Sequence, residues 1–174
     1  MVLTVADVPK ASIESLMSRY GLAIHVQVDG EDITGSFWGD SEAGVVGRAV
    51  YVRSDTPVHS LLHETCHIVC MPADRRADLD TDAGGDDLEE AAVCYLQVLL
   101  ADDIESCGRD RLMADMDEWG YSFRLGDTRS WFENDAEDAL QSERRAASAI
   151  EQAEHNWAIV LCRVMVDLLA PVDR

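Results

Sequence analysis

The sequence predicts an α+β domain in which a helix and a small, mostly antiparallel sheet come first and several helices follow. Short runs between residues 22 and 52 alternate apolar and polar residues, which is the pattern of half-buried strands. Beyond residue 59 the apolar residues recur at helical spacing. The length of 174 residues suits one domain of ordinary size. We therefore expect one domain over residues 1–174, with a helical C-terminal part from about residue 105.

In the first third of the chain, one helix should precede three strands. Pro9 suits the first turn of a helix, and this helix should end near Tyr20. Asp29-Gly30 is a turn signal between the first two strand candidates. The three candidates are Leu22–Val28, Ile33–Trp38 and Val45–Val52.

The remainder of the chain should be helical. A helix capped at residues 54–56 should run to about Cys70, because Met71-Pro72 ends it. The acidic segment Ala73–Asp87 contains adjacent glycines and is typical of a loop. Further helices are expected at about Asp87–Ile104, Arg109–Trp119 and Arg129–Leu140, and a last one should reach Leu169.

The charge of the chain argues against several classes of partner. Its 34 acidic and 14 basic residues give a formal net charge of -20, which disfavours contact with nucleic acid or anionic membranes. The start lacks the basic region of a secretory signal, and no apolar run is long enough for a membrane span. The five cysteines form no CxxC pair and are expected to be reduced. We therefore expect a cytoplasmic protein.

The strongest motif is HExxH, formed by His63, Glu64 and His67 within a predicted helix. Residues four apart lie on one helix face, so both imidazoles can bind the same metal ion. Glu64 lies beside that face, where a general base for a water molecule is needed. His59, one turn earlier, could be a further ligand, but three histidines in a line reach one tetrahedral ion poorly. We expect His59 beside the site or on the surface.

Catalytic zinc usually has three protein ligands, so a third one must lie elsewhere. The pattern HExxHxxGxxH is excluded because Cys70 and Ala73 occupy its Gly and His positions. Glu89 and Glu90 lie 22 and 23 residues after His67, at the start of the next predicted helix. On a helical wheel Glu89 borders the apolar face, whereas Glu90 points largely away. Glu89 is therefore the preferred third ligand and Glu90 the alternative, unless both only complement the helix dipole.

Two other metal sites use overlapping residues. An EF-hand loop would take its ligands from Asp78, Asp80, Asp82 and Glu89. That fit is partial, because Ala83 stands at the position that favours glycine. A thiolate site would take its ligands from Cys66, Cys70 and Cys94. Buried thiols that pack two helices together are the simpler interpretation of these cysteines.

An aromatic segment at residues 115–126, with Trp131-Phe132 shortly after it, either completes the core or forms a wall of a substrate cleft. In a cleft wall, Tyr121 or Arg124 could stabilise the oxyanion that forms when water attacks a carbonyl. The spacing of the residues does not decide between these roles.

Together, these residues resemble a known family. With His63, Glu64, His67 and the Glu89/Glu90 pair, the sequence is similar to minimal gluzincin metallopeptidases, including the compact core of bacterial ImmA/IrrE-type proteases. The resemblance covers about Val45–Leu100. The segments His63–Pro72 and Asp115–Gly126 also resemble an uncharacterised group of bacterial proteins, which implies no substrate.

The resemblance implies a bacterial zinc metallopeptidase that hydrolyses a peptide or protein substrate. One zinc ion per chain would be held by His63, His67 and Glu89, with Glu64 as base and later as proton donor. The chain departs from the family pattern because no acidic residue follows the glutamate ligand by four positions. Two alternatives are a non-catalytic zinc-binding module for interaction or sensing, and an acidic helical partner of a basic protein. The sequence leaves the substrate and the oligomeric state open.

Overall fold

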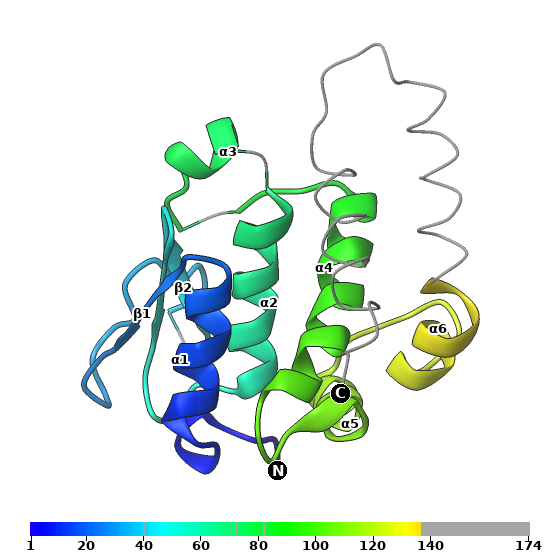
Figure 1. Ribbon diagram of the computed structural model, residues 1–174. Helices are drawn as coiled ribbons and strands as arrows, with labels where there is room; N and C mark the ends of the chain where they lie inside the picture. Colours follow the sequence, from blue (N-terminus) through cyan, green and yellow to red (C-terminus); the bar gives the residue numbers. More distant parts are fainter. Residues whose placement is uncertain (40, 72, 82, 137–174) are drawn as a thin grey trace, which may run out of the picture.

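The computed structural model describes residues 1–39, 41–71, 73–81 and 83–136. Over these residues the chain has the predicted α+β fold (Figure 1). The helices and strands, in chain order, are α1 (Lys10–Arg19), β1 (Ala23–Val26), β2 (Gly44–Val46), β3 (Ala49–Val52), α2 (Val58–Cys70), α3 (Ala73–Ala77), α4 (Asp87–Leu100), α5 (Gly108–Trp119) and α6 (Thr128–Asn134). Short 3-10 turns lie at Val5–Asp7 and Ala101–Asp103.

Helix α2 occupies the centre of the fold. It packs most extensively against α4 and also contacts β3 and α5 (Figure 1). Almost all of its side chains are therefore buried, as the apolar sequence of this helix requires. Within α2, only His63 and Glu64 are partly exposed. The HExxH motif thus lies where the central helix reaches the surface.

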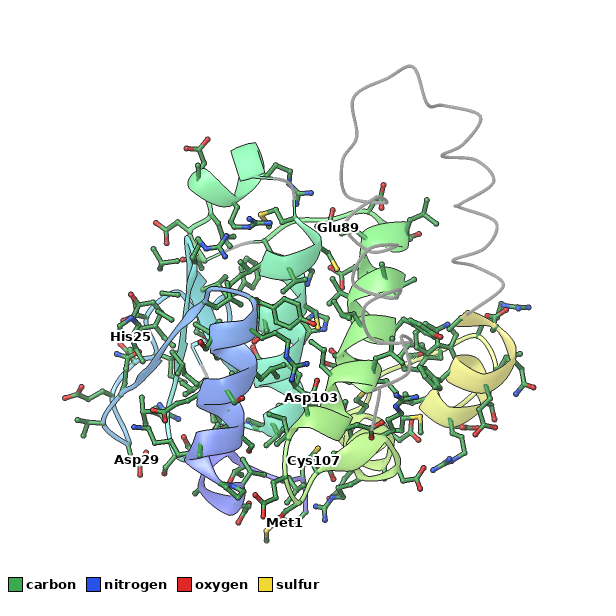
Figure 2. The ribbon with its side chains drawn as sticks, in the orientation of Figure 1. Met1, His25, Asp29, Glu89, Asp103 and Cys107 are labelled. Carbon is green, nitrogen blue, oxygen red and sulfur yellow. The ribbon has the colours of Figure 1, made fainter. Side chains whose placement is uncertain are left out.

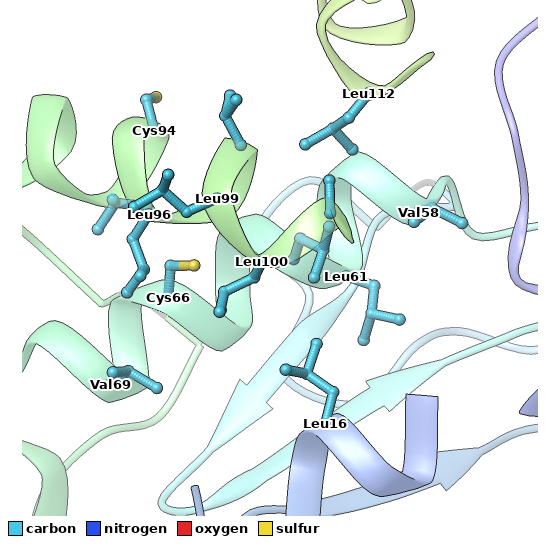
Figure 3. Close-up of a cluster of buried hydrophobic side chains, with 14 of the residues drawn as sticks. Leu16, Val58, Leu61, Cys66, Val69, Cys94, Leu96, Leu99, Leu100 and Leu112 are labelled. Carbon is cyan, nitrogen blue, oxygen red and sulfur yellow. The ribbon is translucent and has the colours of Figure 1, made fainter. Parts of the chain in front are cut away.

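The apolar core joins α1, α2, α4 and α5. Figure 3 shows Leu61 of α2 and Leu100 of α4 in one cluster with Leu16 of α1 and Leu112 of α5. All four leucines have no exposed surface. Burial of leucine side chains contributes about 1.5–3 kcal/mol each to the free energy of folding, so this cluster fixes how the helices meet.

The sheet is small and mixed, with the strand order β1-β3-β2. β1 pairs with β3 in parallel, and β2 pairs with β3 antiparallel. The expectation of mostly antiparallel pairing therefore holds for one of the two strand pairs. The candidate strand Val45–Val52 is in fact a hairpin, because Gly47 adopts a positive φ of 59° and reverses the chain.

The candidate strand Ile33–Trp38 is not a strand in the structure. Gly35 has a positive φ of 70°, which breaks the extended conformation. The segment also lies very close to Gly44. A Cβ atom on Gly44 would lie 2.0 Å from the carbonyl oxygen of Thr34. This close approach leaves the aromatic side chains of Phe37 and Trp38 at the surface.

The helices agree with the predicted ranges to within a few residues, with three differences. The expected loop at residues 73–87 contains the short helix α3. The helix predicted up to Ile104 ends at Leu100 and continues as a 3-10 turn. The helix predicted from Arg129 to about Leu140 ends at Asn134 as α6. The last predicted helix, up to Leu169, lies outside the described residues. Across the described part of the chain, none of the helices has the length and apolar character that crossing a membrane requires.

Packing between α2 and α4 should dominate the stability of the fold. Leu96 of α4 is fully buried, whereas Leu88 on the same helix is 49% exposed. Leu96→Ala should lower the free energy of unfolding by about 2–5 kcal/mol, because it leaves a cavity in the core. Leu88→Ala is the matched control and should cost less than about 1 kcal/mol. Urea denaturation measures both, and equal losses would contradict the described packing.

Candidate metal centre

Two antiparallel helices bring three ligand side chains together. His63 and His67 lie one turn apart on α2, and Glu90 lies in the first turn of α4. The Nε2 atoms of the histidines are 3.1 Å apart. The carboxylate oxygens of Glu90 lie 3.3 Å from Nε2 of His67 and 3.7 Å from Nε2 of His63. Among the residues that the structure describes, this is the only group of three or more such ligands.

These separations fit a tetrahedral metal ion. Zinc binds imidazole nitrogen and carboxylate oxygen at about 2.0–2.2 Å, so two ligand atoms in a tetrahedral site lie about 3.3–3.5 Å apart. The separations of 3.1, 3.3 and 3.7 Å fall on both sides of that value, with one carboxylate oxygen of Glu90 facing each histidine. Two imidazoles and one carboxylate form a donor set typical of catalytic zinc, which keeps its fourth position open. The arrangement therefore suits one ion held by three side chains.

Gln97 fixes the orientation of His63. Its amide oxygen Oε1 lies 3.0 Å from Nδ1 of His63. Because an amide oxygen only accepts hydrogen bonds, Nδ1 carries the proton and the lone pair is on Nε2. That nitrogen is the one that faces His67 and Glu90. Orientation of a ligand histidine by a hydrogen bond to its other nitrogen is common in metal sites.

The sequence analysis did not identify Gln97. A signal was present, because Gln97 is the only polar side chain in the otherwise apolar run of α4 from Tyr95 to Leu100. It is fully buried, and its amide nitrogen contacts the sulfur of Met116 at 3.0 Å. A buried polar side chain in such a run needs a specific partner.

The surroundings keep both imidazoles neutral. Burial lowers the pKa of His63, although the hydrogen bond to Gln97 partly opposes this. Burial, His63 and Arg75 together lower the pKa of His67 to about 3. A neutral imidazole is the form that binds a metal ion. Burial and the nearby Glu89 raise the pKa of Glu90.

Glu89 does not join the histidines. Its carboxylate accepts a hydrogen bond of 2.6 Å from Arg75, which also donates to the carbonyl oxygens of Ala83 and Gly84. Figure 2 labels Glu89 at the N-terminal turn of α4. The structure therefore favours the alternative ligand, Glu90. The apolar face of α4 packs against α2. The two histidines face the edge of this helix contact, and the half-buried Glu90 lies at the same edge.

Two cavities meet beside the cluster of His63, His67 and Glu90, which is called the cluster below. One, of about 470 Å³, is lined by residues that include His63, Glu64 and Glu90. The other, of about 450 Å³, includes His63 and Glu90 in its lining as well. Tyr121 lines both cavities, and its ring centre lies 6.0 Å from that of His63. The two cavities therefore share three lining residues, His63, Glu90 and Tyr121.

The structure separates the two proposed oxyanion stabilisers. Tyr121 borders the cluster, and burial raises the pKa of its phenol, so that its hydroxyl stays a hydrogen-bond donor. Arg124 lies on the surface, where it forms an ion pair with Asp135. It lines neither cavity. The aromatic segment thus supplies a cleft wall through Tyr121 and core packing through Trp131, which is 6% exposed.

His59 is buried rather than on the surface. It is 1% exposed and packs against the rings of Trp119 and Tyr121. Neither of its ring nitrogens has a hydrogen-bond partner in the structure. Burial lowers its pKa to about 4, although the charge of Asp115 opposes this. His59 thus supports the wall of the larger cavity as a neutral ring.

The other two candidate metal sites are not assembled over the described residues. Cys66, Cys70 and Cys94 are free, buried thiols (Figure 3 shows the first and last of them), and they form no three-ligand group there. In the candidate EF-hand loop, Asp82 lies outside the described residues and Glu89 is paired with Arg75. The three buried thiols pack between α2 and α4, in agreement with the simpler interpretation of the sequence.

Comparison with family models, with curated proteins and with solved structures gave no match for the chain.

The two neighbouring glutamates allow a direct test of the ligand set. Glu90→Gln should lower zinc affinity at least tenfold, because it removes a charged ligand. Glu89→Gln is the matched control and should keep one zinc ion per chain, since the carboxylate of Glu89 pairs with Arg75 and does not face the histidines. Elemental analysis after dialysis, with a competing chelator for affinity, measures both. Loss of zinc in the Glu89 variant alone would contradict the geometry.

The buried His59 should make the metal-free fold sensitive to acid. Its pKa is about 4 in the fold and 6.5 as a reference, so the unfolded chain binds the proton more strongly between these values. The free energy of unfolding should therefore fall as the pH falls from 6.5 to 4, by about 3 kcal/mol from this group. His59→Phe should remove that part of the pH dependence in urea denaturation with chelator present. His25→Phe, the same change at an exposed imidazole on β1, is the control for the substitution itself.

Proposed function

We propose that this protein is a zinc-dependent hydrolase that cleaves peptide bonds. The observation that carries the proposal is the group of His63, His67 and Glu90, whose ligand atoms lie near the separations of a tetrahedral site. His63 and Glu90 of this group line two cavities. Glu64, the general base of the HExxH motif, lines one of those cavities. An inert structural zinc site has four protein ligands, whereas this group offers three.

The two histidines and Glu90 would hold the ion. A zinc ion bound there supplies a Lewis acid that polarises the carbonyl of the substrate and lowers the pKa of water toward about 7. The neutral state of both imidazoles suits this role, since neutral imidazole is the form that binds a metal ion. Gln97 keeps Nε2 of His63 directed at the cluster.

Two residues beside the cluster would transfer the protons and stabilise the negative charge that develops on the substrate carbonyl. The carboxylate of Glu64 would accept a proton from the attacking water and later donate it to the leaving amine. The hydroxyl of Tyr121 would donate a hydrogen bond to the oxyanion. Such a donor must remain protonated, and the raised pKa of the buried phenol supports this.

The cytoplasm of a bacterium is the compartment that we propose. Four cysteines, Cys66, Cys70, Cys94 and Cys107, are free thiols. Free thiols persist in reducing compartments.

Glu64→Gln tests the proposal. The variant should keep one zinc ion per chain and lose hydrolysis of a fluorogenic peptide mixture by about 100-fold or more, because the base is gone. Glu14→Gln, the same change at an exposed position of α1, is the control and should keep full activity.

Each contrary result has a separate meaning. A parent protein that binds zinc but cleaves no peptide would contradict the hydrolase and favour a zinc-binding module for interaction or sensing. A parent protein that binds no zinc would contradict the metal centre itself and favour an acidic protein that binds a basic partner.

A further inference from the structure

The larger cavity at the cluster has an aromatic rim at the surface. Phe37, Trp38 and Trp119 line this cavity, and they are 61%, 73% and 44% exposed. Phe37 and Trp38 form an edge-to-face pair with ring centres 4.9 Å apart. Large aromatic side chains gathered at the surface of a soluble protein are typical of a binding site.

The same cavity is acidic. Three carboxylates line it, those of Glu42, Glu64 and Glu90. No lysine or arginine occurs among its described lining residues. Arg75 lies behind Ala83 and Gly84 of the wall, where its guanidinium is paired with Glu89. An anionic side chain placed in the cavity would therefore meet mostly like charges, whereas a cationic side chain would meet opposite charges. The net charge of -20 adds an attraction of the same sign.

The second cavity differs in its walls. Its lining includes the apolar side chains of Ala91, Cys94, Phe123 and Trp131. It shares His63, Glu90 and Tyr121 with the larger cavity. The two cavities thus present different chemistry on either side of the same three residues.

We propose that the larger cavity binds an arginine or lysine side chain of the peptide substrate, next to the bond that is cleaved. This inference rests on the proposed peptidase function and adds its substrate class. The aromatic rim would hold the aliphatic stem and the cation, since indole rings attract cations most strongly among aromatic side chains. The carboxylate of Glu42, which is neither a proposed metal ligand nor the proposed base, would neutralise the charge. The volume of about 470 Å³ is that of an ordinary ligand pocket.

The test measures binding without catalysis. Intrinsic tryptophan fluorescence would follow the binding of capped pentapeptides Ala-Ala-X-Ala-Ala to the full chain in the presence of chelator. X is arginine, its neutral isostere citrulline, or glutamate. The arginine peptide should bind at least about tenfold more tightly than the citrulline peptide, and the glutamate peptide more weakly still.

Variants locate the binding on the protein. Trp38→Ala and Glu42→Gln should each reduce the preference for arginine over citrulline several-fold. Trp38 is largely exposed, so its truncation should leave the stability of the fold unchanged. Glu14→Gln changes the net charge equally on α1 and should keep the preference. Isothermal titration calorimetry repeats the measurement for Trp38→Ala, in which a fluorescence signal is lost.

Equal affinities for arginine and citrulline would overturn the proposal, as would a preference that Glu14→Gln and Glu42→Gln reduce equally. The second result would assign the preference to net charge alone. Zinc content and peptide cleavage are measured separately on the same preparations. Failure of this inference is therefore distinct from failure of the metal centre or of the hydrolase function.

Discussion

The contact between α2 and α4 is the constraint on which the site depends. The two helices run antiparallel, so that the turn of α2 with His67 faces the first turn of α4 with Glu90. About two turns further along α4, Gln97 reaches His63. Leucines and cysteines fill most of the contact, and His63 and Glu90 lie at its partly exposed margin. A shift of α4 by one turn, about 5.4 Å, would remove all of these pairings together.

The polar side chains in this contact carry a cost that partners must offset. Gln97 is fully buried and is satisfied by His63 and Met116. Glu89 is nearly buried, and Arg75 balances its charge. Arg75 also holds the carbonyl oxygens of Ala83 and Gly84, so the same side chain closes the loop before α4. Glu89 thus binds the arginine that holds the loop before α4, whereas its neighbour Glu90 faces the two histidines.

The part of the site that sequence could predict is the local part. His63, Glu64 and His67 lie within one turn of a single helix, and the period of the helix alone places them. The third ligand belongs to another helix, and its choice depends on how α2 and α4 face each other. The helical wheel locates the centre of the apolar face, to which Glu89 is closer. Ligands that line a cavity must instead lie at the edge of the apolar face, which is the position of Glu90.

The sheet shows the same distinction. β1 and β3 follow from their alternating residues, whereas the alternation at Ile33–Trp38 gives no strand. The positive φ of Gly35 and its close approach to Gly44 are tertiary features that no short pattern reveals. The outer edge of β2 is instead covered by residues 79–81, where Thr81 donates to the carbonyl oxygen of Val45. The aromatic side chains of Phe37 and Trp38 line the larger cavity beside the cluster.

X-ray absorption at the zinc edge, on full-length protein loaded with one equivalent of zinc, tests the metal centre most directly. The described geometry predicts a first shell of nitrogen and oxygen atoms only, at about 2.0–2.2 Å, with the multiple-scattering signal of two imidazoles. Glu90→Gln should alter that shell, and Glu89→Gln should not. Sulfur at about 2.3 Å would instead place the zinc on the thiols of Cys66, Cys70 or Cys94 and contradict the assignment to His63, His67 and Glu90.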